Sequence, residues 1–286
     1  MVELQVPEVD YTRYSNRQLA SIPLAVLVLA LLIIAGWYVT TGAPVTPGME
    51  FTGGTEMRIQ TDVPQSEVPQ AFEEDVSSVT ATQSSGNAYI VQFQSTNTDT
   101  LSTQAQQAGF EVVSVQTTSA SFGAESQRLA LYGIVAAFVG MSVLVFLMFR
   151  SFVPSIAVVL SAFSDIVIPV ALMNVLGIKL SLGTVTALLM LIGYSVDSDI
   201  LLNNHILRRS GDFYESTYRA MRTGVTMTVT SISAMAVMAL VAAFFQVDLL
   251  RSIGVVLVLG LATDLMNTYM LNLSLLRWYK FEGVAR

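Results

Sequence analysis

The sequence contains no cysteine and a single histidine, His205. Without cysteine the chain can form neither disulfides nor thiolate metal sites, and one histidine cannot supply the cluster that a zinc site needs. Charged residues are also scarce: they are 12% of the 286 residues, against 53% hydrophobic residues and a mean hydropathy of +0.60. This composition excludes an ordinary soluble domain and predicts an integral membrane protein, with no metal or organic cofactor expected.

Six apolar runs are each long enough to cross about 30 Å of hydrocarbon at about 1.5 Å per residue. They cover approximately residues 22–40, 129–149, 155–176, 181–203, 225–245 and 252–276. The first run exceeds the apolar core of a signal peptide and lacks a small-x-small cleavage site, which favours a retained span. The predicted organisation is an N-terminal segment 1–21, a first transmembrane helix 22–41, a polar domain 42–127, transmembrane helices over 128–276 and a tail 277–286.

The cationic residues predict which side of the membrane each segment faces. With the N-terminus inside the cell, most of them are cytoplasmic: Arg13, Arg17, Arg150, Arg208, Arg209, Arg219, Arg222, Arg277, Lys280 and Arg286. The other side holds Arg58, Arg128, Lys179 and Arg251. Cytoplasmic loops of membrane proteins are enriched in Lys and Arg, so both termini are expected in the cytoplasm. The polar stretch 42–127 is then an extracytoplasmic domain.

This polar stretch has the pattern of a small α+β domain. Strands are predicted after the glycines of "GMEFTGGTEMRIQTD", in "SVTATQ", in "AYIVQFQS" and in "FEVVSVQTTSA". Helices are predicted in "SEVPQAFEEDV" and "TDTLSTQAQQAG". The resulting order, β-α-β-β-α-β, is typical of the ferredoxin-like split βαβ fold.

The same stretch is strongly acidic and has Arg58 as its one cation. Its acids are Glu50, Glu56, Asp62, Glu67, Glu73, Glu74, Asp75, Asp99, Glu111 and Glu125. Such a surface suits a solvent rich in screening cations and so indicates a high-salt organism, although simple solubility explains it equally well. Because phosphate binding needs clustered Lys and Arg, nucleic acid is not expected as a partner.

Four aspartates fall inside the apolar runs, and none has a basic residue in the core of its own run. They are Asp165, Asp197, Asp199 and Asp264. A charged Asp at the centre of a span costs about 2.5–3.5 kcal/mol on the insertion scale, so each is expected to be protonated, hydrated or facing another helix. We expect Asp197 and Asp199 to be the ion-responsive pair, with Asp165 and Asp264 second. The alternative is that some of these acids only hold helices together or contact a partner chain.

The sequence around the pair, "GYSVDSDILLNNH" at residues 193–205, supplies further polar candidates. Residues two apart on a helix diverge by about 200°, so the two acids face different neighbours. Asp199 shares a face with Asn203, and Asp197 shares one with Tyr194 and Asn204. The fifth run adds a track of hydroxyls suited to bond a neutral Asp or hold water, made of Thr226, Thr230 and Ser233.

Two local motifs and the layout carry a family resemblance. Glu50 precedes "FTGGT", which contributes Phe51, Gly53, Gly54 and Thr55, and "GYSVDSD" begins at Gly193. Six spans with one large loop after the first is the layout of half a resistance-nodulation-division transporter. On these features the chain resembles the SecD/SecF family of protein-export membrane proteins. The acidic domain and the Asp-Ser-Asp sequence point to the archaeal, halophilic branch.

The resemblance implies an accessory, non-enzymatic subunit that pairs with SecD beside the SecYE translocon and assists the exported polypeptide. It also implies coupling to an ion gradient, of protons or sodium ions, within the cytoplasmic membrane. The chain departs from the bacterial pattern at Ser198, which stands between the two acids, and at Thr226, which replaces an arginine of the fifth span. Arg222 lies about one turn earlier. The bacterial proton relay therefore does not transfer whole.

Two other classes of function share features of this sequence. A small-solute exporter of the resistance-nodulation-division type shares the half-fold, but one half with one small outer domain needs a partner chain. An intramembrane aspartyl protease needs an acid dyad, and its Gly-x-Gly-Asp signature is missing. Gly53 and Gly54 are expected to provide positive φ angles or close packing, because no strand-to-helix phosphate loop is present.

Overall fold

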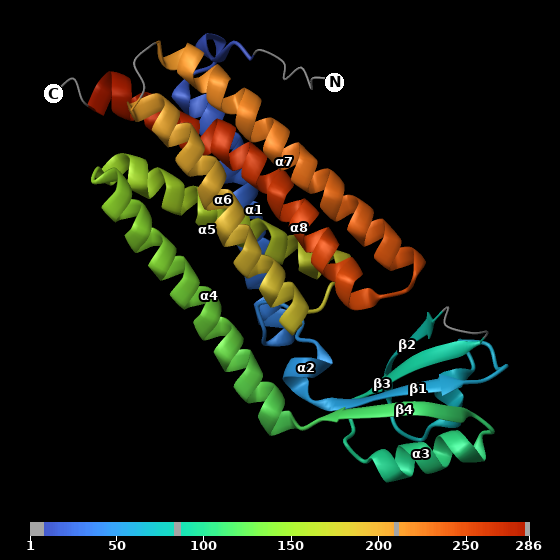
Figure 1. Cartoon of the computed structure of the whole chain (residues 1–286). Helices are drawn as coiled ribbons and strands as arrows, with labels where there is room; N and C mark the ends of the chain where they lie inside the picture. Colours follow the sequence, from blue (N-terminus) through green and yellow to red (C-terminus); the bar gives the residue numbers. More distant parts are fainter. Residues whose placement is uncertain (1–8, 83–86, 209–211, 284–286) are drawn as a thin grey trace.

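The computed structural model describes residues 9–82, 87–208 and 212–283. Within these residues, six helices are long and apolar enough to cross a membrane, as predicted, and a small sheet domain lies between the first and the second (Figure 1). The first five are α1 (Asn16–Thr41), α4 (Ala120–Phe149), α5 (Phe152–Leu176), α6 (Leu182–Arg208) and α7 (Phe213–Phe244). The sixth runs continuously through α8 (Asp248–Met266), η3 (Asn267–Asn272), α9 (Leu273–Trp278) and η4 (Tyr279–Gly283).

Several helices begin before the apolar runs do, because capping residues set their first turns. Ser15 and Gln18 form a reciprocal capping box at the start of α1, with N–H to side-chain oxygen distances of 2.9 and 3.2 Å. Ser119 caps α4 by accepting from the Phe122 N–H at 3.3 Å, so this helix begins inside the predicted polar stretch. Asp212 caps α7 in the same way.

The domain between α1 and α4 has the predicted sheet topology. Its strands are β1 (Gly54–Gln60), β2 (Val76–Thr82), β3 (Ala88–Phe93) and β4 (Glu111–Thr118). They pair antiparallel in the order β2-β3-β1-β4, the arrangement of a split βαβ domain. Helix α3 (Thr98–Gln107) is confirmed, and its Leu101 packs into the sheet core with Ile59 and Phe93.

The first predicted helix of this domain is wrong in type. Only the 3-10 turn η2 (Val68–Ala71) forms there, with Pro69 in its first turn. Phe72 directly after it is extended, so no longer helix follows. Proline at that position is compatible with a helical start, but it removes one backbone donor from an already short element.

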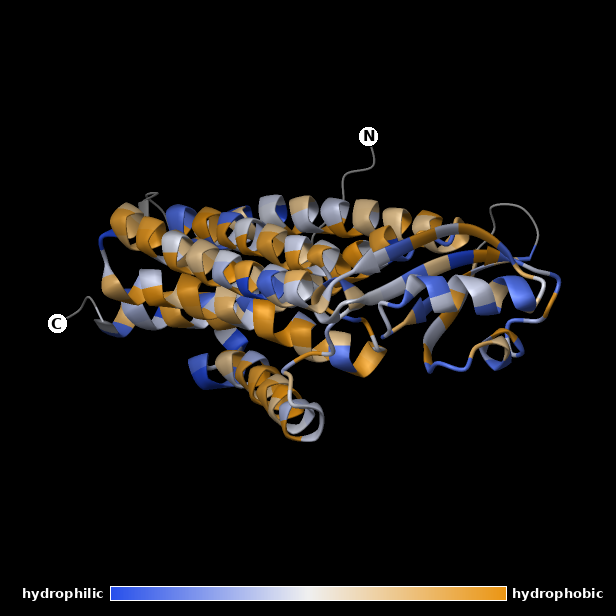
Figure 2. Cartoon of the chain, turned by 90° about the horizontal axis from the view of Figure 1, so that it is seen from below, coloured by the Kyte–Doolittle hydropathy of each residue, from blue (hydrophilic) through white to orange (hydrophobic). Residues whose placement is uncertain are grey.

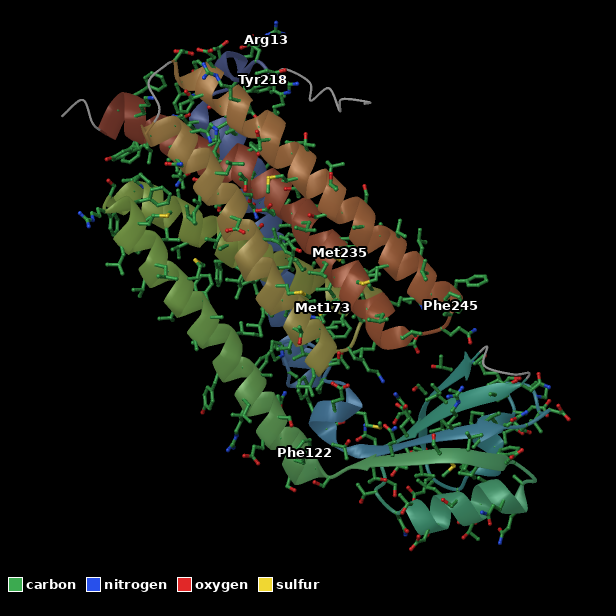
Figure 3. The ribbon with its side chains drawn as sticks, in the orientation of Figure 1. Arg13, Phe122, Met173, Tyr218, Met235 and Phe245 are labelled. Carbon is green, nitrogen blue, oxygen red and sulfur yellow. The ribbon has the colours of Figure 1, made fainter. Side chains whose placement is uncertain are left out.

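Helix α6 occupies the middle of the bundle and packs against α5, α7 and α8. Helix α4 diverges from the bundle toward the sheet domain and is largely exposed within this chain (Figure 1). Hydrophobic residues predominate along the helices of the bundle (Figure 2), and many of their large apolar side chains are exposed, as lipid contact requires. Arg13, just before α1, and Tyr218 lie at the end of the bundle opposite the sheet domain, and Phe122 lies at the end next to that domain (Figure 3).

A short helix, α2 (Met49–Thr52), connects the end of α1 to β1. It lies between the sheet domain and the nearest ends of α4 and α6 (Figure 1). The described residues of the domain are therefore joined to the bundle through α2, through the continuous passage from β4 into α4, and through contacts with the loop before α6.

Candidate functional site

Three of the four predicted carboxyls meet in the interior of the helix bundle. Asp165 comes from α5, Asp199 from α6 and Asp264 from α8, and their exposed fractions are 1%, 0% and 2%. Ionised Asp165 and Asp199 would repel each other, and Asp264 would repel both. Among the described residues, no Lys or Arg forms an ion pair with any of the three. The group is a buried acidic network, which we call the aspartate network.

Each oxygen of Asp165 receives one hydrogen bond from a neighbouring helix. Ser195 Oγ donates to Oδ2 at 2.6 Å, and Asn267 Nδ2 donates to Oδ1 at 2.6 Å. Ser195 lies one turn before Asp199 on α6, so the two acids are held against the same stretch of that helix.

Asp199 is bonded on one oxygen only. Thr268 Oγ1 donates to its Oδ1 at 2.9 Å and Asn272 Nδ2 donates to the same oxygen at 2.7 Å. Its Oδ2 is buried without a partner among the described residues. A buried oxygen of this kind is the natural place for a proton or a water molecule.

Asp264 is connected to Asp199 through shared hydroxyls. Ser198 Oγ donates to Asp264 Oδ1 at 2.7 Å, and Thr268 Oγ1 lies 3.2 Å from the same oxygen. The two hydroxyl oxygens are 3.3 Å apart. Ser198, the residue between the two acids of the sequence motif, therefore belongs to the network although it carries no charge.

The sixth span changes its winding where it meets the network. After Asp264 it becomes the π-helix η3, whose wider turn supplies Asn267, Thr268 and Asn272, all 0% exposed. Short π-helical segments in α-helices occur often at functional sites. Here the segment places three polar side chains on carboxyls of two other helices.

Sequence reasoning missed the donors of this network. They are Ser195, Ser198, Asn267, Thr268 and Asn272. A usable signal was present: Asn267 and Thr268 follow Asp264 at three and four residues, the spacing of one helix face, and Ser195 stands in the same relation to Asp199. A search for polar residues that share a face with each acid would have found Ser195, Asn267 and Thr268. It would not have found Ser198 or Asn272, which lie at other spacings from the acids.

Asp197 lies on another face of α6, away from the network. It is exposed and lines a groove of about 280 Å³ between α4 and α6, with no hydrogen bond to the described residues. The rest of the lining is apolar apart from the backbone: Met141, Leu144, Val145, Met148, Ile192, Gly193, Val196 and Ile200. Tyr194 is 39% exposed on the same helix.

The remaining polar candidates do not reach the carboxyls. Asn203 is buried and donates from Nδ2 to the Pro154 carbonyl at 3.3 Å, whereas Asn204 is exposed. The fifth-span hydroxyls each donate to the carbonyl four residues earlier in α7, at 2.7–2.8 Å: Thr226, Thr230 and Ser233. The structure thus separates this hydroxyl track from the aspartate network.

The FTGGT motif lies at the junction of the sheet domain and the bundle. Gly53 and Gly54 have φ angles of +79° and +135°, which confirms the expected positive φ. A Cβ on Gly53 would lie 2.7 Å from the first backbone nitrogen of α4. Phe51 is buried, Thr55 Oγ1 donates to a carbonyl beyond β3 at 2.7 Å, and Glu50 accepts from the backbone at the start of α6.

Comparison with known proteins identifies the family. Residues 98–282 match the family described as "Protein export membrane protein SecD/SecF, C-terminal". The chain is 71% identical to the protein-export membrane protein SecF of Haloferax volcanii and 68% identical to that of Haloquadratum walsbyi, over 100% of both chains in each case. The chain belongs to the SecD/SecF family of protein-export membrane proteins. Both organisms are halophilic archaea, the branch that the acidic domain and the fourth-span motif indicate.

Solved SecDF structures share the fold of this SecD/SecF family member. SecDF from Thermus thermophilus has a TM-score of 0.72 at 20% identity, covering 97% of this chain. SecDF in a super-membrane-facing form has a TM-score of 0.59 at 18% identity. The chain spans 39% and 40% of those two longer chains, and the predicted half-transporter fold with one inserted ferredoxin-like domain is confirmed.

Proposed function

We propose that the chain is an accessory subunit of Sec-dependent protein export in the cell membrane, and that its aspartate network couples this work to a proton gradient. The observation that carries the coupling is the burial of Asp165, Asp199 and Asp264 in the interior of the bundle, each bonded by polar side chains and, among the described residues, none ion-paired with Lys or Arg. Intramembrane acids are costly and mark ion pathways by default. The full-length relatives named SecF support the export role and do not favour the exporter alternative.

The donors around the network favour protons over sodium ions. Asn267 and Asn272 direct their Nδ2 groups at the carboxylates, and Ser195 and Thr268 direct hydroxyl protons at them. A sodium ion would need these positions to offer oxygen lone pairs. A proton moving onto a carboxyl needs only the rotation of a hydroxyl, which both donates and accepts.

A second membrane chain of the SecD type is the proposed partner. Asp197 offers a carboxyl from within an apolar groove between α4 and α6, which calls for a donor from another transmembrane helix. The SecYE translocon and the exported polypeptide are the further partners proposed, with lipid around the bundle. The role requires no covalent chemistry.

The proposed orientation places both termini in the cytoplasm and the sheet domain outside. Arg13, Arg277 and Lys280 support it, because they gather at the end of the bundle away from the sheet domain. Cations of short loops remain on the cytoplasmic side.

The test is export with and without a proton gradient. The variants Asp165→Asn, Asp199→Asn and Asp264→Asn should insert and bind the partner normally, slow export while a gradient is present, and match the unmodified protein once the gradient is collapsed. Asp248→Asn, an exposed acid at the start of α8, is the matched control and should export normally. Normal export by all three network variants would refute the coupling, and altered tolerance to toxic solutes would favour the exporter.

A further inference from the structure

A single side chain links the junction helix α2 to the beginning of α6. Glu50 Oε2 accepts a hydrogen bond of 2.6 Å from the backbone N–H of Leu182, 132 positions away in sequence. Leu182 is the first residue of α6. The first N–H groups of a helix have no partner within the helix and form the positive end of its dipole, so a carboxylate there is favourable both as acceptor and as charge.

Backbone pairing holds the same two segments in register. The Leu180 N–H donates to the Thr46 carbonyl at 2.8 Å, and the Gly48 N–H donates to the Leu180 carbonyl at 2.7 Å. A Cβ on Gly48 would lie 2.9 Å from that carbonyl oxygen, so glycine permits the approach. Glu50 is thereby held within reach of α6.

Helix α2 is also packed against the start of α4, where the chain leaves the sheet domain. Gly53 lies against the backbone where β4 passes into α4, and a Cβ there would be 2.7 Å from the Ala120 nitrogen. In α4, a Cβ on Gly123 would be 2.7 Å from the Phe51 carbonyl oxygen. Close packing of backbone on backbone leaves α2 little freedom to move independently of the domain.

Helix α6 also carries Asp199, about 26 Å beyond its first residue at about 1.5 Å per residue. A proton bound in the membrane can act on a chain outside it only through elements that span both regions. Asp199 belongs to α6, and Glu50 contacts the first residue of the same continuous helix.

We propose that Glu50 is a positioning residue that ties the displacement of α6 to the sheet domain, so that a change of state in the aspartate network reaches the domain. This inference rests on the proposed function. We infer specifically that the hydrogen bond from the Leu182 N–H to the Glu50 carboxylate makes the sheet domain move with α6. The backbone contacts of the FTGGT motif alone would not do so.

Because the sequence contains no cysteine, two introduced cysteines report the distance between the sheet domain and a helix of the bundle without background labelling of this chain. Spin labels at Gln106→Cys on α3 and Leu240→Cys on α7 are both at exposed positions. They report movement of the domain relative to a helix that the Glu50 bond does not hold. Distances are measured on the full chain with its SecD-type partner in lipid vesicles, with and without Asp199→Asn. Export is measured on the same proteins without labels.

Four variants test the bond itself. Glu50→Ala removes the acceptor, whereas Glu50→Gln keeps an oxygen there. Leu182→Pro removes the donor from the other side, and proline is tolerated at the first position of a helix. Glu56→Ala is the control, because this carboxylate accepts from Gln92 within the sheet at 3.0 Å.

With Glu50 present, Asp199→Asn should shift the label distance. Glu50→Ala and Leu182→Pro should each abolish the shift and lower export about tenfold, as loss of one charge-assisted hydrogen bond predicts. Adding Asp199→Asn should lower export no further. Glu50→Gln should retain the shift, and Glu56→Ala should behave as the unmodified protein.

If Asp199→Asn still shifts the label distance in both Glu50→Ala and Leu182→Pro, and export is intact in these two variants, this inference is overturned. The proposed function would then still stand. Normal export by all three network variants, Asp165→Asn, Asp199→Asn and Asp264→Asn, would instead refute the proposed coupling. Glu50→Ala and Leu182→Pro break the same bond from opposite sides. If both variants are recovered with the partner in normal amounts, a shared effect is due to loss of the bond and not to misfolding of one variant.

Discussion

Asp199 and Asp264 share one hydroxyl: Thr268 Oγ1 lies 2.9 Å from Asp199 Oδ1 and 3.2 Å from Asp264 Oδ1. A hydroxyl has one proton, so it donates to one of these carboxyls at a time. The protonation of either carboxyl therefore changes the donor available to the other. This gives α6 and the sixth span a direct chemical connection in the middle of the bundle.

Thr268→Val should break this connection at nearly constant volume. We expect gradient-dependent export to fall by about tenfold, because two buried carboxyl oxygens lose a donor worth about 1–3 kcal/mol. Thr263→Val is the matched control: Thr263 is buried on the same span, and its hydroxyl donates only to the Leu259 carbonyl at 2.9 Å. Equal export by the two variants would show that the shared hydroxyl does not matter.

Asp199→Asn and Asp264→Asn should be non-additive. Residues of one hydrogen-bonded network act together, so the double variant should export about as slowly as the worse single one. Asp199→Asn combined with Asp197→Asn should be additive, because Asp197 is exposed on another face of α6. Export rates of the single and double variants decide this, and additive effects of the first pair would argue against a common network.

Gly260→Ala should force α6 and α8 apart. A Cβ on Gly260 would lie 2.2 Å from a methyl carbon of Leu191, and overpacking of this kind costs about 1–3 kcal/mol. Gly140→Ala on α4 has nothing within 4 Å and should be neutral or stabilising. Thermal unfolding in detergent measures both, and a stable Gly260→Ala protein would show that the close approach is not needed.

Tyr11→Phe should change the response of the protein to alkaline pH. Burial raises the pKa of the Tyr11 phenol from its usual 10 to about 12, and its hydroxyl donates to Met221 Sδ at 3.3 Å. The folded protein keeps this proton between those values while the unfolded chain loses it. The contribution of Tyr11 to stability is thus complete below pH 10 and is lost as pH rises through 12.

The measurement is the unfolding midpoint from pH 9 to about 12, a range that begins below the ordinary tyrosine pKa of about 10. Tyr11→Phe should be less stable at the low end of that range and less sensitive to pH across it. Tyr14→Phe is the control, because Tyr14 is 48% exposed. An identical pH dependence in Tyr11→Phe and the unmodified protein would contradict the predicted role.

The spans and the sheet topology were predictable because their signals are local. Apolar runs such as residues 155–176 are long enough to identify without knowledge of their neighbours. The alternation of β1 and β3 and the spacing of α3 gave the order of the ferredoxin-like domain. The 3-10 turn at Val68–Ala71 was missed because the spacing of apolar residues predicts a helix but does not show that proline limits its length.

The sequence by itself determined that four aspartates lie inside the apolar runs, and that Asp197 and Asp199 point in different directions, since this second point follows from helix geometry alone. Only the tertiary structure decided which acid enters the network. A span that is apolar on every side carries no amphipathic signal to show which face meets other helices and which meets lipid. The packing of α6 against α5 and α8 buries Asp199 with Asp165 and Asp264, while the π-helical turn of the sixth span brings its amides and hydroxyl within reach of Asp165 and Asp199.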